Sequence, residues 1–226
     1  MIERYFFEGA KFAWAAPGAV SNVPRDGSIN PTAVVASALT FQDLDPTLFD
    51  TNQANKFRNL GLTRGNAVPH DWLNYVHGQT ATINTNNDVL TGFMSGCIIV
   101  VYNDAMGIRQ VGHIGTIDGA AKDQPPNSTV KNGFAAAMRT NPPTFTNVKG
   151  YKLLDAWGGG EMSARTTKFK NPPFGGRVRI VSLVTANSQF FSVLLLQRNP
   201  QVDEYICGGI KPCYAMGPNL LLQALQ

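Results

Sequence analysis

The chain has 226 residues, of which 43% are hydrophobic and 10% aromatic, so its composition is that of a folded protein with a sizeable core. Charged residues make up only 15%, and the net charge of +4 comes from 19 basic and 15 acidic residues scattered along the sequence, which does not favour a nucleic-acid partner. No apolar run approaches the roughly 18 residues that a membrane-spanning helix needs, so no membrane span is expected.

The N-terminal region carries charges among its apolar residues. Glu3, Arg4 and Glu8 interrupt the apolar stretch that a classical cleavable signal peptide would need, so none is expected. Export by a specialised route would leave no such mark, and a cytoplasmic location stays open as well. A short strand is predicted over residues 5–7.

One helix is predicted over residues 43–60. Asp45 followed by Pro46 is typical of an N-cap and a first helical position, and the apolar residues that follow recur at an imperfect helical spacing. Gly61 is expected to end the helix, because glycine readily adopts the left-handed conformation found there.

Two hairpins are predicted in the remainder of the chain. Residues 97–102 and 108–116 are expected to pair around a turn at 103–107, and residues 177–185 and 189–197 around a second turn. The longest apolar run of the chain, CIIVVY, is the first strand of the first hairpin.

Two long segments are interpreted as partner-selecting loops. Residues 119–147 are rich in proline and asparagine, with one or two helical turns at 133–139, and residues 158–176 begin with three glycines. Residues 151–157 fit either a strand or a short helix.

Glycine and proline content points to short elements throughout. The 22 glycines and 14 prolines favour many turns, and we expect about ten strands with two to four short helices. The fold class predicted from this pattern is α+β: one β-dominated catalytic domain over residues 1–226, with a central mixed β-sandwich flanked by a few short helices.

The first hairpin contains one cysteine and one histidine. With the turn centred on residue 105, antiparallel pairing places Cys97 directly opposite His113 on one sheet face. A thiol beside an imidazole is the pair that nucleophilic cysteine chemistry needs. Gly96 lets a substrate carbonyl approach the sulfur and leaves backbone amides for an oxyanion. The same residues also fit a buried, inert cysteine beside a structural histidine.

The other cysteines and histidines show no metal-ligand spacing, and we expect no metal and no cofactor. Cys207 and Cys213 are interpreted as two structural thiols or as a bridge across the intervening glycines. His70 and His77 flank Trp72 and Tyr75, a cluster that is expected to be packing and that could alternatively line the cleft. Asp118 is an alternative carboxylate for orienting His113.

Residues 91–97 (TGFMSGC), followed by His113, resemble the active-site core of the bacterial glutamine deamidase superfamily. This superfamily includes the cytotoxic necrotizing factor catalytic domain, the Burkholderia lethal factor and the chemotaxis receptor glutamine deamidases. Its toxins carry a Leu-Ser-Gly-Cys motif, in which Met94 replaces the leucine here. In the lethal factor and the chemotaxis enzymes a threonine lies six residues before the cysteine, and Thr91 matches it. The resemblance covers residues 91–116 only.

The resemblance implies a protein glutamine deamidase that acts through a thioester. Cys97 would attack the glutamine carboxamide, His113 would protonate the departing ammonia, and Thr91 would orient the imidazole. Ser95 and Gly96 would contribute to the oxyanion site, although Ser95 fits a turn-stabilising role equally well.

The resemblance also implies a biological setting. The protein would be a monomeric bacterial toxin or effector, secreted or injected, that acts in the cytosol of a target cell. Its partner would be a protein substrate carrying a target glutamine, such as a Rho-type GTPase, a translation factor or a receptor. A central β-sandwich flanked by helices is the fold implied.

Two other classes of function stay open. The same pair fits another thiol acyl-transfer enzyme, namely a transglutaminase, a cysteine peptidase or an amidase. A non-enzymatic β-rich binding module with a buried Cys97 is the other alternative. The reaction products, or the absence of thiol reactivity, would discriminate between them.

Overall fold

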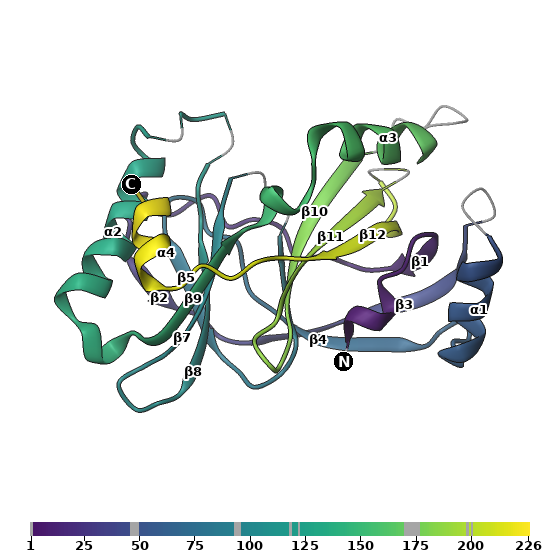
Figure 1. The fold of residues 1–226 in the computed structure, drawn as a ribbon, viewed down its shortest axis with the longest axis horizontal. Helices are drawn as coiled ribbons and strands as arrows, with labels where there is room; N and C mark the ends of the chain where they lie inside the picture. The colour runs from purple at the N-terminus through teal and green to yellow at the C-terminus, as the bar shows by residue number, and fades with distance from the viewer. Residues whose placement is uncertain are drawn as a thin grey trace.

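The computed structural model describes residues 2–45, 50–92, 96–117, 119–121, 123–169, 177–197, 199 and 201–226, and within these it contains twelve strands in two sheets (Figure 1). One group of strands comprises β1 (Ala10–Ala13), β3 (Val35–Leu44), β4 (Ala67–Trp72), β6 (Val89–Gly92), β10 (Arg177–Val184), β11 (Phe190–Gln197) and β12 (Glu204–Pro212). These seven close into a barrel in the order β1-β12-β11-β10-β6-β4-β3.

The other five strands form an open sheet beside the barrel. They are β2 (Ile29–Pro31), β5 (Thr80–Asn84), β7 (Ile98–Asn103), β8 (Arg109–Ile114) and β9 (Thr146–Lys152), in the order β2-β5-β8-β7-β9. The helices are α1 (Thr51–Asn59), α2 (Asn127–Thr140), α3 (Gly159–Phe169) and α4 (Pro218–Ala224), with short 3-10 turns η1 (Ile2–Tyr5), η2 (Pro142–Thr144) and η3 (Leu153–Ala156).

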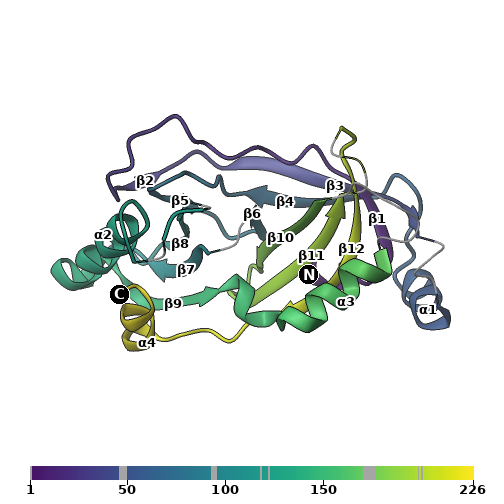
Figure 2. The same ribbon diagram turned by 90° about the horizontal axis from the view of Figure 1, so that it is seen from above.

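These elements stack in layers. The barrel lies against one face of the open sheet, and α2 and α4 cover the opposite face (Figure 2). Helix α3 runs along the outside of the barrel, and α1 lies at the end of the barrel away from the sheet (Figure 2). The sheet is therefore buried on both faces.

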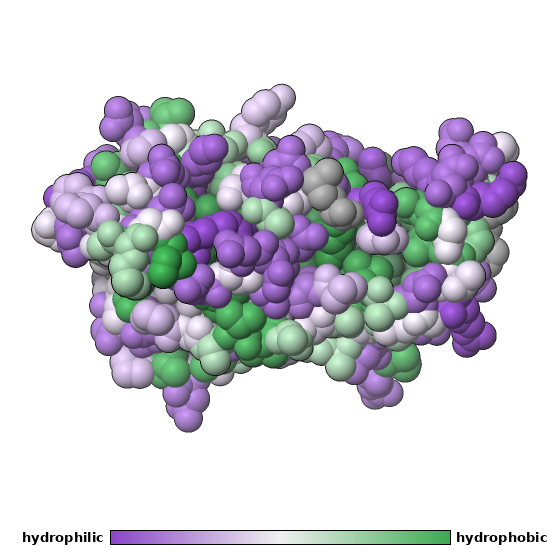
Figure 3. Space-filling model, turned by 90° about the horizontal axis from the view of Figure 1, so that it is seen from below, coloured by the Kyte–Doolittle hydropathy of each residue, from purple (hydrophilic) through white to green (hydrophobic). Residues whose placement is uncertain are grey.

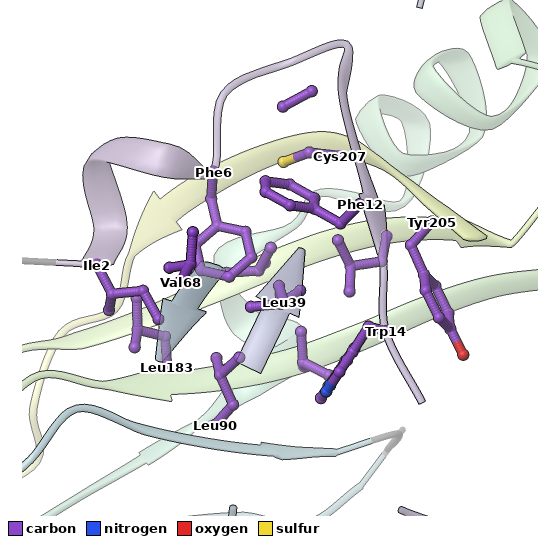
Figure 4. Packing of buried hydrophobic residues seen from close by; sticks show 14 of the residues in the cluster. Ile2, Phe6, Phe12, Trp14, Leu39, Val68, Leu90, Leu183, Tyr205 and Cys207 are labelled. Carbon is purple, nitrogen blue, oxygen red and sulfur yellow. The ribbon is translucent and has the colours of Figure 1, made fainter. Parts of the chain in front are cut away.

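Large apolar side chains fill the barrel interior. Phe12, Trp14 and Leu39 point toward one another inside it, together with residues from the N-terminal turn and from β12 (Figure 4). Successive side chains on a strand point to opposite faces, so Val181 and Leu183 of β10 face this interior while their neighbours face the open sheet.

Strand β7 shows why the longest apolar run of the sequence has no polar alternation. Ile99 and Val101 face the barrel, whereas Ile98, Val100 and Tyr102 face α2 and α4. A strand that is covered on both faces is apolar on both, and this is what the run CIIVVY encodes.

The predicted fold class is confirmed. The described residues form a β-dominated α+β domain, and both sheets are mixed, because β2 pairs with β5 and β4 with β6 in parallel. One of the two packed sheets closes into a barrel, a detail that the sequence pattern did not predict. The second predicted hairpin is also confirmed, as β10 and β11 pair from Arg177–Gln197 to Val184–Phe190.

The predicted helix over residues 43–60 begins too early. Its first two residues belong to β3, and α1 starts at Thr51. The N-cap is Asp50, whose carboxylate accepts hydrogen bonds from the backbone amides of the two residues after Thr51 at 2.7 and 3.0 Å. Pro46 lies outside the described residues. The predicted end is right, since Gly61 follows the helix with φ +59°.

Three further predictions of local structure need correction. The segments 119–147 and 158–176 are not only loops, because they contain α2 and α3. In α2, Val130 and Phe134 recur at helical spacing and pack on the sheet, a signal hidden by the surrounding small residues.

Instead of a strand over residues 5–7, the chain forms η1 and a loop. Residues 151–157 combine both proposed states, the end of β9 and η3.

The surface carries no continuous apolar belt on the face seen in Figure 3, where apolar residues lie in small groups among polar ones. Within the described residues, no helix has both the length and the apolar character needed to cross a membrane.

Candidate functional site

The β7–β8 hairpin brings Cys97 and His113 to the same face, but with a different register from the predicted one. His113 pairs with Ile99, since the turn is centred one residue later than expected. This moves the pairing by two positions, and an even shift preserves the face. Cys97 is therefore the diagonal neighbour of His113 and not its direct partner, and within the described part of the chain no hydrogen bond joins its sulfur to Nε2 of the imidazole.

Thr91 and His113 meet across the boundary between the two sheets. Thr91 comes from β6 of the barrel wall and His113 from β8 of the open sheet, and both are fully buried. Thr91 Oγ1 lies 2.6 Å from His113 Nδ1, a hydrogen-bond distance. The threonine thus fixes the imidazole through one of its two nitrogens.

The second ring nitrogen of His113, Nε2, is buried without a hydrogen-bond partner among the described residues. The whole side chain is completely buried. Such orphaned buried groups are rare in folded proteins and call for a functional or structural reason. Burial also lowers the pKa of His113 to about 3, so its imidazole is neutral around pH 7.

Cys97 lies just before β7 and is 3% exposed. Its sulfur is 3.5 Å from the Thr116 hydroxyl and 3.7 Å from the Thr116 carbonyl oxygen. Gly96 lies at the surface, and a Cβ there would come within 3.3 Å of the same hydroxyl, which is closer than most Cβ contacts. Met94 and Ser95, like Asp118, lie outside the described residues.

A small cavity of about 90 Å³ gives access to Cys97. It is lined by Gly96, Cys97, Ile98, Lys131, Lys152, Leu153, Leu154 and Asp155. A larger cleft of about 590 Å³ shares Lys152 and Asp155 with this cavity and continues along β12 to Tyr214 and Met216. The cysteine therefore lines a small cavity that adjoins a larger cleft.

Three side-chain hydroxyl groups lie in a row across the part of the barrel wall that faces the open sheet. Thr91, Ser182 and Ser192 face one another across β6, β10 and β11; the first two bond to residues of the open sheet and the third to Trp157, just after η3. Their partners are His113 for Thr91, Tyr151 for Ser182 and the Trp157 ring nitrogen, at 2.7 Å, for Ser192. The Thr91–His113 contact is thus one member of a set of polar bonds between the barrel and the sheet.

Replacing Tyr151 with phenylalanine is expected to lower the free energy of unfolding by about 1–3 kcal/mol, because the fully buried Ser182 hydroxyl loses its partner. Urea denaturation of both proteins measures this. Tyr214→Phe is the control, since Tyr214 is 97% exposed and the same change there should leave stability unaltered. Equal stability of Tyr151→Phe and the wild type would contradict the proposed role of the row.

The remaining cysteines and histidines lie away from Cys97 or serve as packing groups. His70 is buried on β4 with its ring edge against Trp14, and His77 contacts the ring of Tyr75. Cys207 and Cys213 do not form the bridge considered above, and burial raises the pKa of each thiol to about 12. Among the described residues, no three His, Cys, Asp or Glu side chains gather closely enough to hold a metal ion.

Sequence reasoning missed Thr116 and placed Tyr75 in a cluster that was expected to pack, with lining of the cleft as the alternative. Tyr75 stacks on His113, and Thr116 contacts Cys97. Thr116 had a usable signal, because it ends the return strand of the hairpin and so lies near the start of β7. Tyr75 had none, because a loop brings it to the hairpin.

Comparison of this chain with protein-family models, with curated proteins and with solved structures finds no match. The resemblance to the glutamine deamidases therefore rests on Thr91, the motif ending at Cys97, and His113.

Proposed function

We propose that this protein is a thiol-dependent amidohydrolase that converts a glutamine side chain of a target protein to glutamate. One observation carries the proposal: Thr91 engages Nδ1 of a buried, neutral imidazole, while Nε2 lacks a partner among the described residues. Cys97 projects from the same sheet face as His113. An imidazole held in this way is suited to take a proton from a neighbouring thiol.

The proposed reaction has two steps. The Cys97 sulfur attacks the carboxamide carbon as its proton passes to His113 Nε2, and that proton then leaves with the amide nitrogen as ammonia. Water, deprotonated by the same nitrogen, attacks the thioester, and the proton returns to the sulfur as glutamate is released. Thr91 Oγ1 accepts the Nδ1 hydrogen throughout, so that Nε2 keeps its lone pair toward the reaction.

The cavity at Cys97 supports a side chain as the group attacked. Its small volume suits a carboxamide at the end of a flexible stem, whereas the larger adjoining cleft has room for the chain on either side. Lys131 and Lys152 line the cavity and favour negative charge developing on the carboxamide oxygen. The backbone at Gly96 is the remaining candidate for oxyanion donors.

The motif resemblance extends the proposal to a bacterial effector or toxin, monomeric and acting in the cytosol of another cell. Its target would be a folded protein of the kinds modified within the superfamily, a Rho-type GTPase, a translation factor or a receptor. The helices α2 and α3 and the cleft near Tyr214 are the surfaces on which target selection would depend.

The test is to incubate the protein with soluble protein extracts and to measure ammonia together with the masses of the extract peptides. Deamidation releases ammonia and adds roughly one dalton to the modified glutamine. Cys97→Ala is the matched inactive variant, and Cys213→Ala the control for a cysteine in the adjoining cleft.

Each other class of function predicts a different product in that experiment. New peptide termini would show a peptidase, and an amine adduct on glutamine would show a transglutaminase. Ammonia release that persists unchanged in Cys97→Ala would overturn the proposal. So would the absence of any product combined with a Cys97 that resists iodoacetamide, which is the result expected of a binding module.

A further inference from the structure

The loop that joins β4 to β5 is hydrogen-bonded to Gly115, which follows β8 at the open end of the β7–β8 hairpin. The Gly78 amide donates to the Gly115 carbonyl at 2.7 Å, and the Gly115 amide donates to the Gln79 carbonyl at 3.0 Å. A Cβ at Gly115 would lie 1.9 Å from the Val76 carbonyl oxygen, so only glycine permits this approach. The backbone of residues 75–79 is thereby held against the strand that carries His113.

Because the loop lies this close to the strand, the ring of Tyr75 covers the imidazole of His113. Its ring is stacked on that of His113, with centroids 4.9 Å apart and an angle of 11° between the planes. Tyr75 is 7% exposed, so the stack shields the imidazole face from water. Together with the Thr91 bond at Nδ1, the stack leaves the imidazole ring little freedom to rotate.

The hydroxyl of the same tyrosine reaches the neighbourhood of the nucleophile. It donates a hydrogen bond to the Thr116 carbonyl oxygen, the atom that lies 3.7 Å from the Cys97 sulfur. By holding Thr116 in place, this bond fixes the carbonyl and the hydroxyl that contact the Cys97 sulfur.

We infer that Tyr75 is a positioning residue for the Cys97–His113 pair, acting through its ring on the base and through its hydroxyl on Thr116. The inference rests on the proposed function. It assigns to the loop between β4 and β5 a positioning role at the site, in addition to Thr91 and the hairpin itself.

Two substitutions separate the two contacts of Tyr75. Tyr75→Phe keeps the stack and removes the bond to Thr116, whereas Tyr75→Leu removes both. The rate of Cys97 alkylation by iodoacetamide is measured from about pH 5 to about pH 8. Tyr75→Phe is expected to slow alkylation by a few-fold, and Tyr75→Leu by about tenfold with a steeper pH dependence, because the base is misplaced.

Tyr102→Phe is the matched control. Tyr102 is a buried tyrosine on the opposite face of β7, with its hydroxyl hydrogen-bonded to Thr82 and its ring against Phe145. It loses a comparable hydrogen bond without touching Cys97 or His113, and its alkylation profile should match that of the wild type. Wild-type profiles in both Tyr75 variants would overturn the inference.

The imidazole itself provides a readout that does not depend on activity. The nitrogen chemical shifts of His113 in NMR spectra report which ring nitrogen carries the hydrogen. We expect one tautomer in the wild type and in Tyr75→Phe, and a mixture in Tyr75→Leu. A single unchanged tautomer in Tyr75→Leu would overturn the role of the stack, even if Cys97 proves unreactive and the proposed function fails.

Discussion

Replacing His113 with glutamine is expected to slow the alkylation of Cys97 by iodoacetamide below about pH 8, where a thiol without a base is largely un-ionised. Burial lowers the pKa of His113 to about 3, so the imidazole is neutral in this range and can accept the thiol proton as the sulfur attacks, but it is too weak a base to hold that proton before the attack. Glutamine fills similar space but is no base.

The size of the effect follows from the thiolate fraction. Without a base, alkylation depends on ionisation of a thiol with an ordinary pKa of about 8.5, so the rate rises about tenfold for each pH unit. The imidazole adds a route that needs no prior ionisation, but its low pKa makes it a weak general base. Near pH 6 we therefore expect the variant to be slower than the wild type by at most about a hundredfold, and the two should converge at alkaline pH.

The measurement follows each cysteine separately by mass spectrometry of its peptide. Cys207 and Cys213 serve as internal references, since burial raises the pKa of both thiols to about 12. His70→Gln is the control variant, because it makes the same change at a buried histidine on β4, inside the barrel wall. A wild-type rate that already rises tenfold per pH unit and ignores His113→Gln would contradict the proposed pairing.

The apolar pattern of the sequence was sufficient to predict the two hairpins and the face on which the candidate pair lies. A strand repeats every two residues, so the error in the β7–β8 turn altered the partner of His113 without moving Cys97 to the other face. Closure of the barrel was not predictable in this way. It depends on pairing between β1, β3 and β12, which lie at opposite ends of the chain and have no local signal.

The errors at the helix start and at the site have different physical causes. Asp45 and Asp50 both fit an N-cap, and pairing of β3 with β1 extends the strand to Leu44, immediately before Asp45. At the site, the motif resemblance supplied Thr91, whereas Tyr75 reaches His113 only because Gly115 allows a distant loop to approach. Contacts that depend on such packing are absent from any local pattern.

Acidification is expected to destabilise the fold through two buried histidines. Burial lowers the pKa of His113 to about 3 and that of His70 to about 4, both below the value of 6.5 for an exposed histidine. Below pH 6.5 the unfolded chain therefore binds protons at these positions that the folded chain does not. The stability that the neutral histidines contribute is fully present above pH 6.5 and is lost as the pH falls toward the folded pKa values.

The expected loss is large compared with the stability of a typical domain. Each histidine contributes at most about 1.4 kcal/mol per pH unit, and the pair at most about 3 kcal/mol per pH unit, against a total of about 5–15 kcal/mol.

Urea denaturation at about pH 7 and about pH 5 measures the change in the free energy of unfolding. Carboxylates also titrate toward the lower pH, so His113→Gln and His70→Gln isolate the histidine share, each removing about half of it. If the slope is the same in the wild type and in both buried-histidine variants, the two imidazoles are not held neutral by burial, and the pH profile expected for Cys97 loses its basis.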